Sequence, residues 1–161
     1  MQDIYSFLKD NSIDYLQFTH PAVFTCEEAS RLCPMMPGKA IKNLFLYSKQ
    51  KDQYFFVVIG HDKSVDLKKL KTLLNVSHFS FASEEQLKKY IGVEPGSVTI
   101  LGLINDVEHK VSVFIDMPLC GNALQCHPLV NTATLVIDFQ EIERFLKLTG
   151  HAYQCLDIPA R

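Results

Sequence analysis

Three short segments of this 161-residue chain place polar groups that can bind a ligand beside strongly apolar sequence. Lys42 and Asn43 begin the first, and a lysine at the edge of a cleft can hold a phosphate or stabilise a developing negative charge. The second, Gly96-Ser97-Val98-Thr99, follows Pro95, and such a Pro-Gly turn leaves backbone N–H groups open to a ligand. The third contains His127, and a loop histidine can handle protons near neutral pH.

Each of these segments also has a purely structural interpretation. Lys42 lies in a strand that is apolar on both faces, so its ammonium must either reach solvent at a sheet edge or serve a site. The 96–99 segment could be a plain turn that enters a strand, and a histidine beside a proline is often structural. Gly102, inside a predicted strand, indicates a bulge or a close approach of another backbone. From the residues alone, both interpretations stay open.

Several common kinds of catalytic site are missing from the sequence. The five cysteines form no CxxC pair, and no HExxH motif, P-loop, Rossmann glycine pattern or GxSxG elbow occurs. Cys126 adjoins His127, but neighbouring side chains diverge, and no third residue that would orient the pair is evident. We therefore expect no metal and no cofactor, and we expect the cysteines to be reduced thiols.

Length and charge set the class of protein. A chain of 161 residues predicts one domain, residues 1–161, and its net charge of −2 argues against a general nucleic-acid binder. No apolar run is long enough to span a membrane, and the N-terminus shows no secretory signal, so we expect a cytoplasmic protein. A local basic cluster consists of Lys63, Lys68, Lys69 and Lys71, followed by Lys88 and Lys89. Judged by charge alone, these lysines are best explained as the solvated faces of helices.

Helices and strands are interspersed, which predicts an α+β fold with a mixed sheet surrounded by helices. Capping residues mark several helix starts: Thr25 with Glu28, Asp66, Ser83 with Gln86, and Asp138. The expected helices are 2–10, 25–33, 67–74, 84–91 and 139–148. The expected strands are 13–18, 41–48 paired with 53–59, 98–104 paired with 111–115, 134–137 and 153–157.

Taken in order, the segments resemble the YbaK/prolyl-tRNA-synthetase-associated domain family, which hydrolyses aminoacyl esters of mischarged tRNA. The resemblance covers nearly the whole chain and is closest to the free-standing prolyl-tRNA editing proteins, which remove alanine from tRNA for proline. Its motifs are His20-Pro21-Ala22-Val23-Phe24-Thr25, Lys42-Asn43-Leu44-Phe45-Leu46, Pro95-Gly96-Ser97-Val98-Thr99, Gly102-Leu103-Ile104-Asn105-Asp106, His127-Pro128-Leu129-Val130-Asn131-Thr132-Ala133-Thr134 and Thr149-Gly150-His151. The fold that it implies is a single domain with a bifurcated mixed sheet.

The resemblance also implies the site. The functional lysine of the family falls on Lys42, its neighbouring asparagine on Asn43 and its site histidine on His127. Lys42 would engage the terminal adenosine phosphate, while Asn43 and the 96–99 loop would fix the aminoacyl group, with Gly102 as a further substrate-binding position. His127 would shape the pocket and hold a water. The family's Gly-x-x-x-Pro loop ends here in Ile100 instead of proline, which bears on loop geometry and substrate choice.

The implied partners are the acceptor end of an aminoacyl-tRNA and, transiently, prolyl-tRNA synthetase; we expect no membrane association and a monomer. Two alternatives stay open. The protein could deacylate Cys-tRNA or Ser-tRNA, or it could be a non-catalytic module that binds tRNA or a synthetase. A cysteine hydrolase built on Cys126 is a more distant third.

Overall fold

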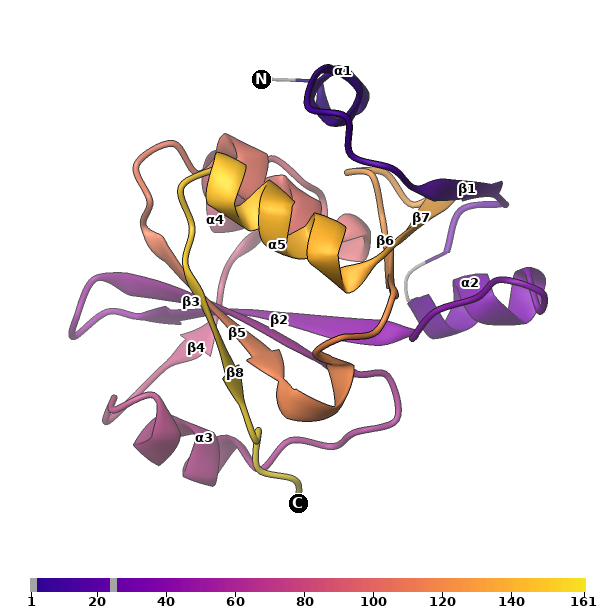
Figure 1. Ribbon diagram of the computed structural model, residues 1–161. Helices are drawn as coiled ribbons and strands as arrows, with labels where there is room; N and C mark the ends of the chain where they lie inside the picture. The colour runs from indigo at the N-terminus through magenta and orange to yellow at the C-terminus, as the bar shows by residue number, and fades with distance from the viewer. Residues whose placement is uncertain (1–2, 24–25) are drawn as a thin grey trace.

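The computed structural model describes residues 3–23 and 26–161 (Figure 1). The helices are α1 (Ile4–Asp10), α2 (Cys26–Leu32), α3 (Leu67–Leu73), α4 (Glu84–Ile91) and α5 (Phe139–Leu148). The strands are β1 (Leu16–Thr19), β2 (Ile41–Ser48), β3 (Gln53–Gly60), β4 (Ser80–Phe81), β5 (Val111–Asp116), β6 (Leu124–Cys126), β7 (Ala133–Ile137) and β8 (Tyr153–Leu156). Short 3₁₀ turns are η1 (Pro95–Ser97), η2 (Ile100–Asn105) and η3 (Met117–Leu119).

The strands form a forked sheet. The larger branch has the order β4-β2-β3-β5-β8, in which β2 and β3 are antiparallel while β3, β5 and β8 run parallel. The smaller branch is antiparallel, with the order β1-β7-β6. The two branches meet just before β2, where Lys39 forms a bridge with Leu124 of β6. This arrangement confirms the predicted mixed, bifurcated sheet.

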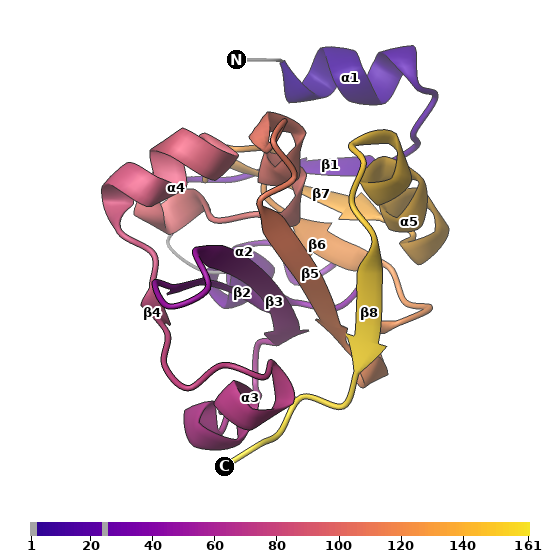
Figure 2. The ribbon, with the colours of Figure 1, turned by 90° about the vertical axis from the view of Figure 1, so that its left-hand side faces the viewer.

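Helices cover both faces of the larger branch (Figures 1 and 2). Alternate residues of β2 point to opposite faces, so Phe45 joins the core under α4 and α5, whereas Leu46 joins the core over α3. Leu70 of α3 and Phe145 of α5 are fully buried in these two cores. The face on which a β2 side chain lies therefore decides which surface of the molecule it can reach.

Most of the predicted elements are confirmed. The 41–48 and 53–59 hairpin is present, and Ser83 with Gln86 forms the expected capping box of α4. Asp66 caps α3 by accepting from the Lys69 N–H. Asp138 occupies the N-cap position of α5 without a side-chain hydrogen bond. The proposed cap at Thr25 and the start of the first helix at Gln2 lie outside the described residues.

The prediction of a strand at 98–104 is wrong. Val98 and Thr99 are the residues between η1 and η2, and 100–104 belong to the buried 3₁₀ turn η2, while β5 pairs in parallel with β3 and β8. A short apolar run reads alike in a buried strand and in a buried helical turn, so periodicity could not separate them. Thr99 starts the turn by accepting from the Leu101 N–H through its hydroxyl.

Gly102 nevertheless marks a close backbone approach, as predicted. A Cβ at this position would lie 2.7 Å from the Ile91 carbonyl oxygen and 2.9 Å from the Ile91 Cβ. Only glycine lets η2 pack this tightly against the end of α4. Its place is thus in the packing behind the 96–99 loop.

The expectation of reduced cysteines is wrong for one pair. Cys120, just after η3, forms a disulfide with Cys155 of β8. Because β8 pairs with β5 and η3 follows β5 directly, the fold brings together two thiols that are 35 residues apart in the sequence. Nothing in the sequence indicated that these two cysteines would meet.

Among the described residues, no helix is long and apolar enough to cross a bilayer.

Candidate functional site

Lys42 and Asn43 are neighbours on β2 that reach opposite faces of the sheet. The Lys42 side chain is exposed, and its Nζ donates to the Lys63 carbonyl oxygen at 3.1 Å. The Asn43 Nδ2 donates to the Val98 carbonyl oxygen, also at 3.1 Å. β4 pairs with β2 only at Leu46 and Tyr47, so both residues lie along a part of β2 that has no strand partner on that side. A ligand lying across this edge can contact both side chains.

Asn43 carries an unusual acceptor. Its Oδ1 is buried and has no hydrogen-bond partner in the described structure. A buried polar atom without a partner costs about 1–3 kcal/mol, so such atoms are rare and demand an explanation. A donor on a bound ligand would satisfy this oxygen, which makes Asn43 the best-supported member of the candidate site.

Two of the three sequence segments meet at one cavity. The cavity has a volume of about 450 Å³ and is lined by Glu84, Glu94, Pro95, Gly96, Ser97, Leu129, Val130 and Asn131. Val98 and Thr99 lie directly behind it, with Val98 held by Asn43. The structure thus brings the 96–99 loop, Asn43 and the loop after His127 to one region. Gly102 supports this region and does not line the cavity.

His127 is buried at the base of the second loop, with only 3% of its surface exposed. Its Nδ1–H donates to the Ala133 carbonyl oxygen at 3.2 Å when the ring is neutral, which leaves Nε2 as an acceptor. Burial lowers the pKa of His127, and the nearby His20 lowers it further, while the hydrogen bond to Ala133 raises it. The ring is therefore neutral at physiological pH.

The loop after His127 is fixed through its backbone. Val23 N–H donates to the Asn131 carbonyl oxygen, and His20 N–H donates to the Thr132 carbonyl oxygen. Leu129 adopts φ of 66°, a left-handed conformation that costs energy for any residue with a side chain. Such backbone strain is concentrated at functional loops, and here the strained residue lines the cavity.

His20 lies beside His127 in the structure, and sequence reasoning did not single it out. Its Nε2 accepts from the Thr134 hydroxyl at 2.8 Å, and its ring lies 6.4 Å from that of His127. The only signal in the sequence was its place in the first matching motif, which gave it no role.

Cys126 is 1% exposed, and its thiol is directed at the Leu124 carbonyl oxygen. This burial does not favour the alternative of a cysteine nucleophile.

The forked sheet and the cavity between the 96–99 loop and the loop after His127 occur in a chain that matches a known family. Residues 20–145 match the aminoacyl-tRNA editing domain family, and the chain belongs to this family.

Relatives extend the similarity to nearly the full chain. The chain is 31% identical to the prolyl-tRNA editing protein ProX of Acetoanaerobium sticklandii, over 98% of this chain and 96% of that protein. It is 33% identical to prolyl-tRNA synthetase associated domain-containing protein 1 of Danio rerio, over 93% of this chain and 83% of that protein. The fold resembles the crystal structure of a candidate trans-editing enzyme for prolyl-tRNA synthetase, with a TM-score of 0.68, 18% identity and coverage of 91% and 87%.

Proposed function

We propose that this protein is a trans-editing aminoacyl-tRNA deacylase that hydrolyses the alanyl ester of tRNA for proline. Membership of the editing family supports the reaction class, and the similarity to a prolyl-tRNA editing protein over nearly the whole chain supports the proline system. The reaction adds water to the ester, which releases free alanine and the tRNA hydroxyl.

The single observation that carries this proposal is the buried, unpartnered Oδ1 of Asn43 beside the 96–99 loop. An aminoacyl ester has a cationic α-ammonium next to its carbonyl, and this group has three N–H donors. Asn43 Oδ1 and the loop carbonyls can accept from it, which fixes the ester relative to an attacking water. Positioning of this kind can supply several kcal/mol of catalysis without a protein nucleophile.

The other residues complete the site. Lys42, at the exposed edge of β2, binds a phosphate of the terminal nucleotide, and its ammonium can also stabilise negative charge that develops nearby. Neutral His127 holds the 127–132 loop that forms the opposite wall. No dedicated general base is assigned, and the vicinal hydroxyl of the terminal ribose assists proton transfer.

Selection of alanine follows from size. A synthetase pocket that fits proline cannot strongly reject the smaller alanine, since a missing methylene is worth only about 1–3 kcal/mol. A second site that admits alanine and excludes proline corrects this error. We propose that the partners are the tRNA acceptor end and, transiently, prolyl-tRNA synthetase, and that the protein works as a monomer in the cytoplasm.

The test is hydrolysis of alanyl-tRNA for proline by the wild type and by Asn43→Ala and Lys42→Ala. Loss of one positioned polar group in such a site lowers kcat/KM by roughly 100-fold. Lys49→Ala is the matched control for Lys42→Ala, because Lys49 is exposed at the far end of the same hairpin. Prolyl-, cysteinyl- and seryl-tRNA serve as comparison substrates.

Three results would contradict parts of this proposal. Full turnover by both site variants would place the site elsewhere, and cleavage of cysteinyl- or seryl-tRNA in preference to alanyl-tRNA would change the substrate. Binding of charged tRNA without hydrolysis of any ester would leave a non-catalytic binding module.

A further inference from the structure

The structure joins the candidate site to a basic surface on the α3 side of the sheet. Lys42 Nζ donates to the Lys63 carbonyl oxygen, which ties the edge of β2 to the 61–66 loop that leads into α3. The Lys63 ammonium itself turns inward, to Asp116 at 2.8 Å and to the Ile158 carbonyl oxygen at 2.7 Å. Lys63 therefore anchors the loop, and the exposed cations on either side of it are Lys42 and those of α3.

Lys68 and Lys69 of α3 are exposed on the outer side of the helix, whose inner side is anchored by fully buried Leu70. Within the described part of the chain, neither ammonium forms an ion pair, and the nearby Asp66 is occupied with capping the helix. Elsewhere, Lys88 and Lys110 pair with Glu94 and Asp52. The surface of Lys42, Lys68 and Lys69, named here the α3 basic face, is thus a local excess of positive charge on a protein of net charge −2.

The opposite side of the candidate site has the other sign. Glu84 and Glu94 are the charged residues that line the cavity at the 96–99 loop. Lys88 offsets the charge of Glu94 through an ion pair, so the net negative charge of the lining comes from Glu84. An aminoacyl-tRNA has the same polarity, with a cationic ammonium on the amino acid and anionic phosphates along the RNA. The charge distribution favours one orientation of the substrate, with its amino acid toward the cavity and its RNA toward α3.

A second cavity adjoins this path. It has a volume of about 600 Å³, and its charged lining residues are Lys39, Asp62, Lys63 and Asp116, of which Lys63 and Asp116 pair with each other. It lies between the start of β2 and the 61–66 loop, at the carboxyl ends of β3 and β5. A cavity of this size has room for a nucleotide, so the chain of an RNA can cross here without being lifted off the surface.

We propose that the α3 basic face binds phosphates of the tRNA acceptor strand as it leaves the site over Lys42. This inference rests on the proposed function for the identity of the RNA, and it adds the direction in which the RNA lies. Lys68 and Lys69 contact backbone phosphates without reading bases, so they raise affinity and not sequence preference.

The first measurement is equilibrium binding of uncharged tRNA for proline over a range of salt concentrations, which does not depend on hydrolysis. The variant is Lys68→Glu with Lys69→Glu. Its matched control is Lys147→Glu, a charge reversal at a lysine of α5 that is exposed on the opposite face of the sheet (Figure 1). Each lost phosphate contact should reduce the slope of log K against log salt by about 1, so the double variant should lose about 2 and bind at least roughly tenfold more weakly at low salt.

The second measurement separates this inference from the proposed function. Alanyl-adenosine carries the ester but no phosphodiester, so the double variant should hydrolyse it like the wild type while losing roughly tenfold in kcat/KM on alanyl-tRNA. Unchanged tRNA affinity and salt slope in the double variant would overturn the inference, as would an equal loss in Lys147→Glu. If the wild type hydrolysed neither substrate, the proposed function would fail. The binding measurement would still show whether the α3 basic face binds tRNA. Binding of an acidic peptide in place of tRNA would also overturn it.

Discussion

At the residue scale, His127 links the site to pH. Burial lowers its pKa from the ordinary value of 6.5, so the folded protein resists protonation of a ring that the unfolded chain protonates readily. Above pH 6.5, His127 is neutral in both the folded and the unfolded protein, and stability is at its full value. As the pH falls from 6.5 toward the lowered pKa of the folded protein, the unfolded chain takes up the proton first, so stability is lost.

We expect the free energy of unfolding to fall between pH 7 and pH 5, and His127→Gln to flatten this fall. A single group can contribute at most about 1.4 kcal/mol for each pH unit. Urea denaturation across this pH range measures the effect. His78→Gln is the control, because His78 is exposed and should leave the curve unchanged. Parallel curves for the wild type and His127→Gln would contradict the assigned cause.

Residue types in the sequence indicated which side chains could bind a ligand, but not how they are arranged. The alternation of side chains along a strand is a local rule, and it puts Lys42 and Asn43 on opposite faces of the sheet. The bond from Asn43 to Val98 and the one from Lys42 to Lys63 join segments that are 55 and 21 residues apart, and no local pattern encodes them. His20 was missed for the same reason, because its partner Thr134 is 114 residues away.

At the element scale, the contact between η2 and α4 positions the 96–99 loop. Gly102→Ala would place a Cβ against the backbone and Cβ of Ile91, neither of which can rotate away. We expect a loss of about 1–3 kcal/mol in unfolding free energy, together with reduced deacylation because the loop shifts. Thermal denaturation and alanyl-tRNA hydrolysis report the two effects.

Gly60→Ala is the matched control for stability. A Cβ there meets only the flexible Asp62 carboxylate, at 3.1 Å. If Gly102→Ala were as stable and active as the wild type, the tight contact would have no part in holding the loop.

Capping residues are local signals, and the helices that follow Asp66, Ser83 and Asp138 are present as predicted. The 98–104 segment failed because its identity depends on α4 lying against it. The unusually small residue within that apolar run, Gly102, was the one visible sign of the contact, although it could not say which element would approach.

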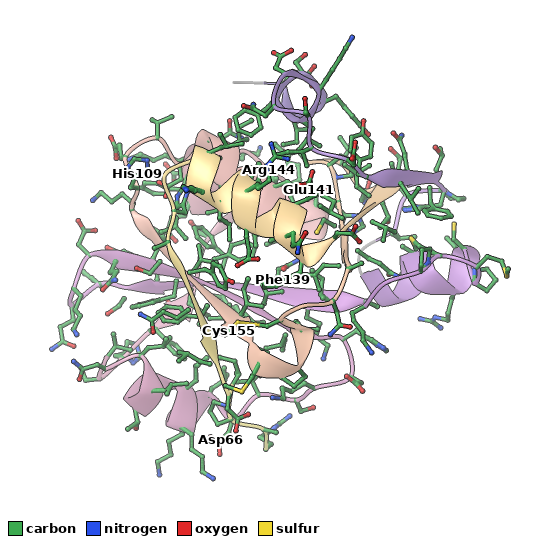
Figure 3. The ribbon with its side chains drawn as sticks, in the orientation of Figure 1. Asp66, His109, Phe139, Glu141, Arg144 and Cys155 are labelled. Carbon is green, nitrogen blue, oxygen red and sulfur yellow. A yellow bond between two sulfur atoms is a disulfide. The ribbon has the colours of Figure 1, made fainter. Side chains whose placement is uncertain are left out.

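At the scale of the whole molecule, the disulfide joins the turn after β5 to β8 near the carboxyl end of the sheet (Figure 3). Closing a loop of 35 residues restricts the unfolded chain, which should stabilise the folded protein by about 3–4 kcal/mol. Cys155→Ser should lose this stabilisation in oxidising buffer and should match the wild type once both are reduced. Urea denaturation with and without a reductant makes the comparison.

Cys33→Ser controls for a general effect of removing sulfur, since Cys33 is not part of the disulfide. Equal stability of the wild type with and without reductant would show that the pair does not stabilise the protein.

The smaller branch of the sheet imposes an order on synthesis. β1 (Leu16–Thr19) pairs with β7 (Ala133–Ile137), which is translated long after it. The His127 loop is held between residues on these distant segments, so a nascent chain still lacking β7 has no template on which to set that loop. The wall of the cavity formed by the His127 loop therefore cannot form during synthesis until β7 has left the ribosome.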